Sequence, residues 1–90
     1  MERIWVKLIK QNKRIRDQVF QSEGLEEESG YASLFEIVSR EMDIPSPVLL
    51  SKHMQQMNDF NHTRFFPEDF LEAVHFDTMD IERLVDKKDK

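Results

Sequence analysis

Hydrophobic and polar positions near the N-terminus alternate with the period of extended strands. The segments "IWVKLI" at 4–9 and "IRDQVF" at 15–20 are rich in β-branched and aromatic residues and flank the polar centre "KQNKR". Two such segments around a short polar centre are typical of a β-hairpin. A four-residue loop at 11–14 would place Trp5 opposite Phe20. The predicted hairpin then has two faces, one with Ile4, Val6, Leu8, Ile15 and Val19, and a second with Trp5, Ile9 and Phe20.

A helical period follows in the middle of the chain. The segment "SLFE" at 33–36 matches a capping box, and the apolar residues after it recur with helical spacing. We expect a first helix that begins at Ser33 and ends near Asp43. Ser46 followed by Pro47 predicts a second helix, because proline is preorganised for the first helical position. The apolar stripe of this helix consists of Leu50, Met54, Met57 and Phe60. We expect its two methionines in the core rather than on an adaptable binding surface.

The last third of the chain predicts a short third helix and a closing strand. "FFPEDFLEAV" at 65–74 has Pro67 at a helix start and two acids in the first turn, where the helix dipole favours anions. "MDIERLV" at 79–85 alternates with the period of a strand. The acidic segment at 21–30 holds both glycines, and we expect a mobile connection there. The predicted fold class is α+β, with a three-stranded sheet packed on helices.

Length and composition limit the class of protein. Ninety residues fit one domain, which we place at 1–86 and follow with a charged tail at 87–90. The absence of cysteine excludes disulfides, zinc-thiolate sites and thiol catalysis. The N-terminus lacks a signal-peptide pattern, and no segment approaches the roughly 18 apolar residues that a membrane span requires. We therefore expect a cytoplasmic protein with no membrane partner.

The net charge of −5 is unevenly distributed along the chain. The first 20 residues carry six cations against two acids, and the remainder is acidic. Cations on a hairpin commonly protect strand edges, and an acidic chain is not typical of nucleic-acid binding. The alternative function is nevertheless a helix-turn-helix-like nucleic-acid-binding regulator. Its contacts would be Lys52, Gln55 and Gln56 on the second helix and Lys10, Lys13 and Arg14 on the hairpin.

Motifs for catalysis or metal binding are weak. His53, His62 and His75 have aspartates nearby, but no two of them share the i, i+4 spacing of a zinc-binding helix. Surface or boundary histidines are the ordinary interpretation. The sequence has no nucleophile elbow, and its two glycines form neither a phosphate loop nor a dinucleotide fingerprint. We expect no enzyme activity, no metal and no cofactor.

Several fragments of the chain carry a resemblance. They are "IWVKLIKQNKRIRD", "DIPSPVLLSKH" and "HTRFFPEDF", followed by a closing "FDTMDIERL". Together they resemble a set of short uncharacterised bacterial proteins that share the hairpin, the Pro-x-Pro turn and the Pro-initiated last helix. The resemblance covers nearly the whole chain. It implies a bacterial cytoplasmic setting and carries over no activity, ligand or site residue.

The predicted function follows from the two faces of the hairpin. Helices that cover one face leave the second face, with Trp5, Ile9 and Phe20, for a partner. We expect a small non-catalytic protein-interaction domain whose partner is another protein or a second copy of the chain. A homodimer would also compensate for the small core of so short a chain.

Overall fold

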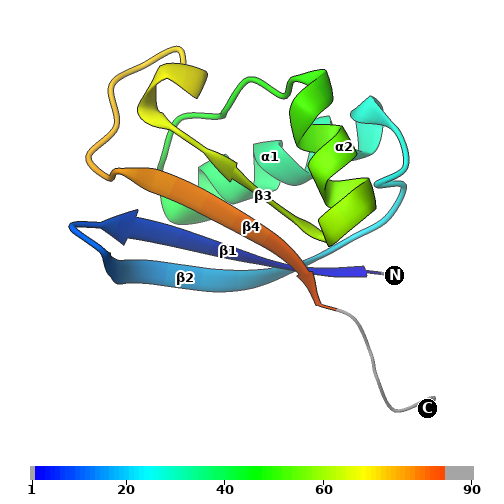
Figure 1. Cartoon of the computed structure of the whole chain (residues 1–90), viewed down its shortest axis with the longest axis horizontal. Helices are drawn as coiled ribbons and strands as arrows, with labels where there is room; N and C mark the ends of the chain where they lie inside the picture. Colours follow the sequence, from blue (N-terminus) through cyan, green and yellow to red (C-terminus); the bar gives the residue numbers. More distant parts are fainter. Residues whose placement is uncertain (1, 85–90) are drawn as a thin grey trace.

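The computed structural model describes residues 2–84 and shows one antiparallel sheet with two helices on one of its faces (Figure 1). The sheet has the order β2-β1-β4-β3, and every pair of neighbours is antiparallel. The α+β class is confirmed, but the sheet has four strands rather than three. The elements are β1 (Glu2–Lys10), β2 (Lys13–Ser22), α1 (Glu28–Met42), α2 (Ser51–Phe60), β3 (His62–Phe65), the 3-10 turn η1 (Pro67–Asp69) and β4 (Thr78–Leu84).

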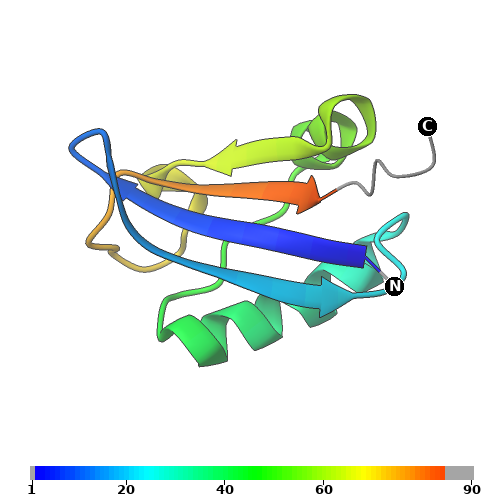
Figure 2. The ribbon, with the colours of Figure 1, turned by 90° about the horizontal axis from the view of Figure 1, so that it is seen from below.

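The core lies between the sheet and the two helices. Ile4, Val6 and Leu8 of β1 are fully buried, and their side chains point toward the helices. Figure 2 shows the strands in front and the helices behind, with α1 on the side of β2 and α2 on the side of β3. Among the described residues no helix covers the near face, so one face of the sheet is left open.

The hairpin closes through a turn of two residues rather than four. Gln11 and Asn12 both have positive φ, 53° and 65°. Two central residues with positive φ form a type I′ turn, whose twist matches that of the flanking strands. A register shift then follows between the pairs that contain Leu8 and Ile9. The predicted four-residue loop is therefore wrong.

The register shift between Leu8 and Ile9 changes which side chains of β2 face the core. Trp5 lies opposite Val19, and Ile4 lies opposite Phe20. A slip of one residue moves every side chain of a strand to the other face. Phe20 is consequently 6% exposed in the core, whereas Val19 is 48% exposed on the other face. Ile15, predicted on the same face as Ile4, Val6 and Leu8, is also exposed.

The acidic segment predicted as a mobile connection forms the end of β2, a turn and the start of α1. Gly24 has a φ of +72°, and its carbonyl accepts the N–H of Glu27 at 3.3 Å. A Cβ atom on Gly30 would collide with the Gly24 carbonyl. Glycine at this position allows the helix to approach the turn, so α1 begins at Glu28, more than one turn before the predicted start at Ser33.

A contact between distant segments limits both α2 and the predicted third helix. Pro47 forms an isolated β-bridge with Phe70, and the chain remains extended there. As a result α2 begins at Ser51 instead of Pro47. On the other side of the bridge, the predicted helix is limited to the turn Pro67–Asp69, because Phe70 adopts extended backbone angles.

The buried side of α2 differs from the predicted stripe. Met57 is buried and Met54 is packed against the core, as predicted. Leu50 and Phe60 are 43% and 63% exposed, however, and the second fully buried residue of the helix is His53.

The C-terminal strand is confirmed within the described residues, at Thr78–Leu84. The predicted charged tail at 87–90 and the last residues of the predicted domain, 85–86, lie outside these residues. No helix between residues 2 and 84 is long and apolar enough to cross a membrane.

Candidate functional site

The side of the sheet that no helix covers is called the open sheet face here, and it consists of the side chains that alternate with the buried ones. Because successive side chains of a strand point to opposite faces, the neighbours of the buried Ile4, Val6 and Leu8 point to the open sheet face. Its apolar members are Trp5, Ile9, Val19 and Leu84.

Two of the three predicted contact residues lie on the open sheet face. Trp5 and Ile9 are half-buried there, on the central strand β1. Phe20 is buried in the core on the opposite face, so it is not available to a partner, and Val19 takes its place. Asn12 signals the two-residue turn, since asparagine tolerates positive φ. The one-residue register shift that moves Phe20 to the core has no such local signal.

Charged neighbours hold the indole of Trp5 in place. Its Nε1 donates a hydrogen bond to Oδ2 of Asp17 at 2.8 Å. The Nζ of Lys7 lies 4.3 Å from the centre of the ring, and the Cζ of Arg14 lies 5.1 Å from it. These are cation–π distances. The indole is therefore already oriented, and a partner that binds it would lose little further side-chain entropy.

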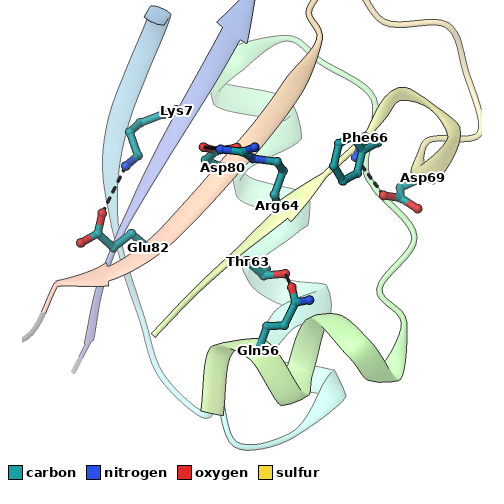
Figure 3. A network of polar contacts seen from close by, with 8 residues as sticks. All are labelled: Lys7, Gln56, Thr63, Arg64, Phe66, Asp69, Asp80 and Glu82. Carbon is teal, nitrogen blue, oxygen red and sulfur yellow. Dashed lines mark hydrogen bonds and ion pairs between the residues drawn. The ribbon is translucent and has the colours of Figure 1, made fainter. Parts of the chain in front are cut away.

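Ion pairs balance most of the charge along the rest of the open sheet face. Lys7 donates to Glu82 at 3.1 Å, and Arg64 donates two hydrogen bonds to Asp80 at 2.9 and 3.0 Å (Figure 3). The hydrogen bonds and charge of Asp80 raise the pKa of Arg64 above its ordinary value. This side of the face is a network of matched charges within the chain.

A buried polar pair joins α2 to the turn after β3. The Nδ1 of His53 accepts the N–H of Leu50 at 3.0 Å, and Oδ2 of Asp69 accepts the N–H of Phe66 at 2.8 Å (Figure 3). Each side chain thus caps the start of its own helical segment. The two side chains meet with Nε2 and Oδ2 3.8 Å apart, and the imidazole stacks on Phe65 with ring centres 4.1 Å apart.

The environment of His53 favours its neutral form. Burial lowers the pKa of His53 below its ordinary value of 6.5, and the carboxylate of Asp69 partly opposes this effect. His62 lies on β3 and His75 in the loop before β4, so the histidines are separated in the fold. Within residues 2–84 no three His, Asp or Glu side chains come together as a possible metal site.

An open groove of about 680 Å³ lies beside β3, between α2 and the charged residues that β4 and Lys7 place on the open sheet face. One wall belongs to α2, and the hydroxyl of Thr63 donates to the side-chain oxygen of Gln56 across the base (Figure 3). Lys52 and Gln56, predicted as nucleic-acid contacts, both line this groove, whereas Gln55 is exposed outside it. We call this the β3 groove. Its lining consists of Lys52, Gln56 and Phe60 of α2, the segment His62–Arg64 of β3, Phe66, the segment Asp80–Glu82 of β4, and Lys7 of β1.

The structure does not bring the two groups of predicted nucleic-acid contacts together. Lys10 and Lys13 flank the hairpin turn and Arg14 lies against Trp5, whereas α2 packs beside β3, at the opposite edge of the sheet from β2 (Figure 1). The connection between α1 and α2 covers residues 43–50. The turn of a helix-turn-helix motif has about three or four residues, so this connection is longer.

No protein-family model, curated protein or solved structure matches the chain. The open sheet face and the β3 groove are therefore interpreted from their own geometry. The resemblance to a set of bacterial proteins stays a prediction.

Proposed function

We propose that the chain is a non-catalytic protein-interaction domain that forms a homodimer through the open sheet face. The observation that carries this proposal is the position of Trp5, which lies with Ile9 and Val19 on a sheet face that neither helix covers. An antiparallel sheet with one face in water usually has polar residues on that face. Tryptophan and arginine are also the residue types most enriched at the energetic centres of interfaces.

A second copy of the chain fits this surface for reasons of shape and charge. Two open faces can stack about 10 Å apart as the layers of a sandwich do. The charges around Trp5 alternate in sign, with Lys7 and Arg14 beside Asp17 and Glu82. A copy related by a two-fold axis can therefore oppose cations to acids. Burial of apolar surface would also stabilise a chain whose own core is small.

Charge substitutions on and off this surface test the proposal. Trp5→Glu and Val19→Glu each place a carboxylate at the centre of the proposed interface. Leu71→Glu makes a comparable change at a residue that is 87% exposed in the loop after η1, outside the open sheet face. We expect the first two variants to be monomers at concentrations where the wild type and Leu71→Glu are dimers.

Gel filtration coupled to light scattering gives the mass of each variant, and circular dichroism shows whether it is folded. All three substituted residues lie outside the core, so folded proteins are expected. If folded Trp5→Glu and Val19→Glu remain dimers, the dimer forms through another surface and the proposal is wrong.

A further inference from the structure

We propose that the free edge of β3 binds an extended acidic segment of a partner protein, which adds to the sheet as a further antiparallel strand. The site lies in the β3 groove, at the other side of the sheet from the hairpin strand β2. It goes beyond the proposed homodimer, because it uses the backbone groups of β3 at the sheet edge, although Lys7 and Glu82 of the open sheet face also line the groove.

The hydrogen-bond pattern shows which backbone groups are free. The N–H of Arg83 donates to the carbonyl of Asn61 at 2.7 Å, so these two residues form a hydrogen-bonded pair. Bonded and non-bonded pairs alternate along an antiparallel ladder. Thr63 therefore bonds toward β4, while the N–H and C=O groups of His62 and Arg64 point away from it. Such groups are a template for an added strand.

The walls of the groove suit an extended peptide. A hydrogen bond from Thr63 to Gln56 joins β3 to α2, so the edge strand runs beside a helix that it contacts directly. Exposed aromatic rings flank the free edge at both ends, Phe60 before β3 and Phe66 after it. The volume of about 680 Å³ lies within the usual range of ligand sites. An edge strand with adjacent pockets is a recurring mode of peptide recognition.

The charge of the groove favours an acidic occupant. Its two acids are matched within the chain, Asp80 by Arg64 and Glu82 by Lys7. Lys52 projects from α2 into the same groove and forms no ion pair within residues 2–84. In a chain with a net charge of −5, this cation is available to a carboxylate of the partner.

A second copy of the chain is a poorer occupant of this edge. Symmetric antiparallel pairing of two β3 strands would place Arg64 of one copy opposite His62 of the other. It would bring no acid of β3 to Lys52, because β3 contains none. Two basic side chains directly opposite each other do not stabilise a strand pair. The edge therefore favours a different protein as its partner.

A peptide array measures whether the edge prefers acidic strands. The probes are ten-residue peptides with valine or threonine at alternate positions and glutamate, serine or lysine between them. We expect the glutamate peptides to bind most strongly, with shifts of the His62 and Arg64 amide resonances on titration of the best one. Absence of binding, or equal binding of the lysine peptides, overturns the proposal. Repeating the titration with Trp5→Glu separates this result from the homodimer, because the edge is intact in that variant.

Two pairs of variants test the backbone bonds and the charge separately. Arg64→Pro and Arg64→Ala both lose the ion pair with Asp80, but only proline removes the outward N–H, and edge strands tolerate it. We expect Arg64→Pro to bind the best peptide at least about tenfold more weakly than Arg64→Ala. Lys52→Glu should weaken binding by a similar factor relative to Lys13→Glu, the same change at the hairpin turn. Circular dichroism confirms folding, and equal affinity within either pair contradicts the corresponding part of the proposal.

Discussion

At the scale of single residues, His53 shows how a polar side chain becomes part of a small core. It is fully buried, yet the sequence predicts a surface or boundary position for it. Its burial depends on two contacts that no local pattern reveals, the stacking on Phe65 and the approach of Asp69 from beyond β3. His53 and Met57 lie one turn apart and define the buried side of α2. The histidine therefore has a structural role, in which burial favours its neutral form.

The stability of the protein is expected to depend on the protonation of His53. Its pKa is lower in the folded chain than the ordinary value of 6.5, so the unfolded chain binds the proton more readily. The free energy of unfolding is then fully retained above a pH of about 6.5 and decreases as the pH falls below it. Urea denaturation at several pH values measures this decrease.

Two variants test whether His53 is the residue responsible for the loss of stability at low pH. His53→Gln should be less stable at every pH but should lose less stability on acidification than the wild type. His62→Gln changes an exposed histidine on β3 and should retain the wild-type pH dependence. An undiminished loss of stability in His53→Gln would assign the effect to another group.

At the scale of the elements, both helices end on a residue with positive φ. Asp43 follows α1 with a φ of 56°, and Asn61 follows α2 with a φ of 65°. Left-handed backbone at the end of a helix is most favourable for glycine. The two residues differ in their side chains, because Oδ1 of Asn61 accepts a hydrogen bond from Arg83 at 3.1 Å. Asp43 instead brings a negative charge to the negative end of the helix dipole.

Glycine should therefore have different effects on stability at the two helix ends. Asp43→Gly is expected to raise the free energy of unfolding by about 0.5 to 1 kcal/mol, since it relieves backbone strain and removes the unfavourable charge. Asn61→Gly should give no gain, because the hydrogen bond to Arg83 is lost with the side chain. Chemical denaturation of the two variants compares them, and an equal gain at both positions would contradict this account of the helix ends.

Hydrophobic periodicity predicted most elements but not their exact alignment. The hairpin, both long helices and the C-terminal strand follow from local patterns. The register of β2 depends on the two-residue turn at Gln11 and Asn12 together with the one-residue shift between Leu8 and Ile9, and this shift changed the face of Phe20. The strand β3 has four residues, too few for its alternation of exposed and buried positions to stand out.

The candidate surfaces were predictable to different degrees, because local patterns place residues within one element but do not show which elements lie side by side. Trp5 and Ile9 belong to one strand, so their alternation with buried residues placed them on a common face. The β3 groove combines α2 with an edge strand, and neither sequence segment indicates the other. The bridge between Pro47 and Phe70, which shortens two predicted helices, likewise joins positions that are distant in the sequence.

At the scale of the whole molecule, the two proposed surfaces have different centres but share a border. The strands β2 and β3 form the two edges of the sheet (Figure 2). The apolar residues Trp5, Ile9 and Val19 lie on β1 and β2, whereas the β3 groove lies beside α2. Lys7 and Glu82 lie next to Trp5 and also line the groove, so they belong to both surfaces.

Sedimentation velocity of the wild-type protein tests the central claim most directly. Samples from about 1 µM to about 1 mM cover the range in which a modest interface associates. Self-association through the open sheet face predicts a shift with concentration toward a single species with twice the mass of one chain, and Trp5→Glu should remain at the mass of one chain. A wild-type protein that sediments as one chain up to the highest concentration would contradict the homodimer.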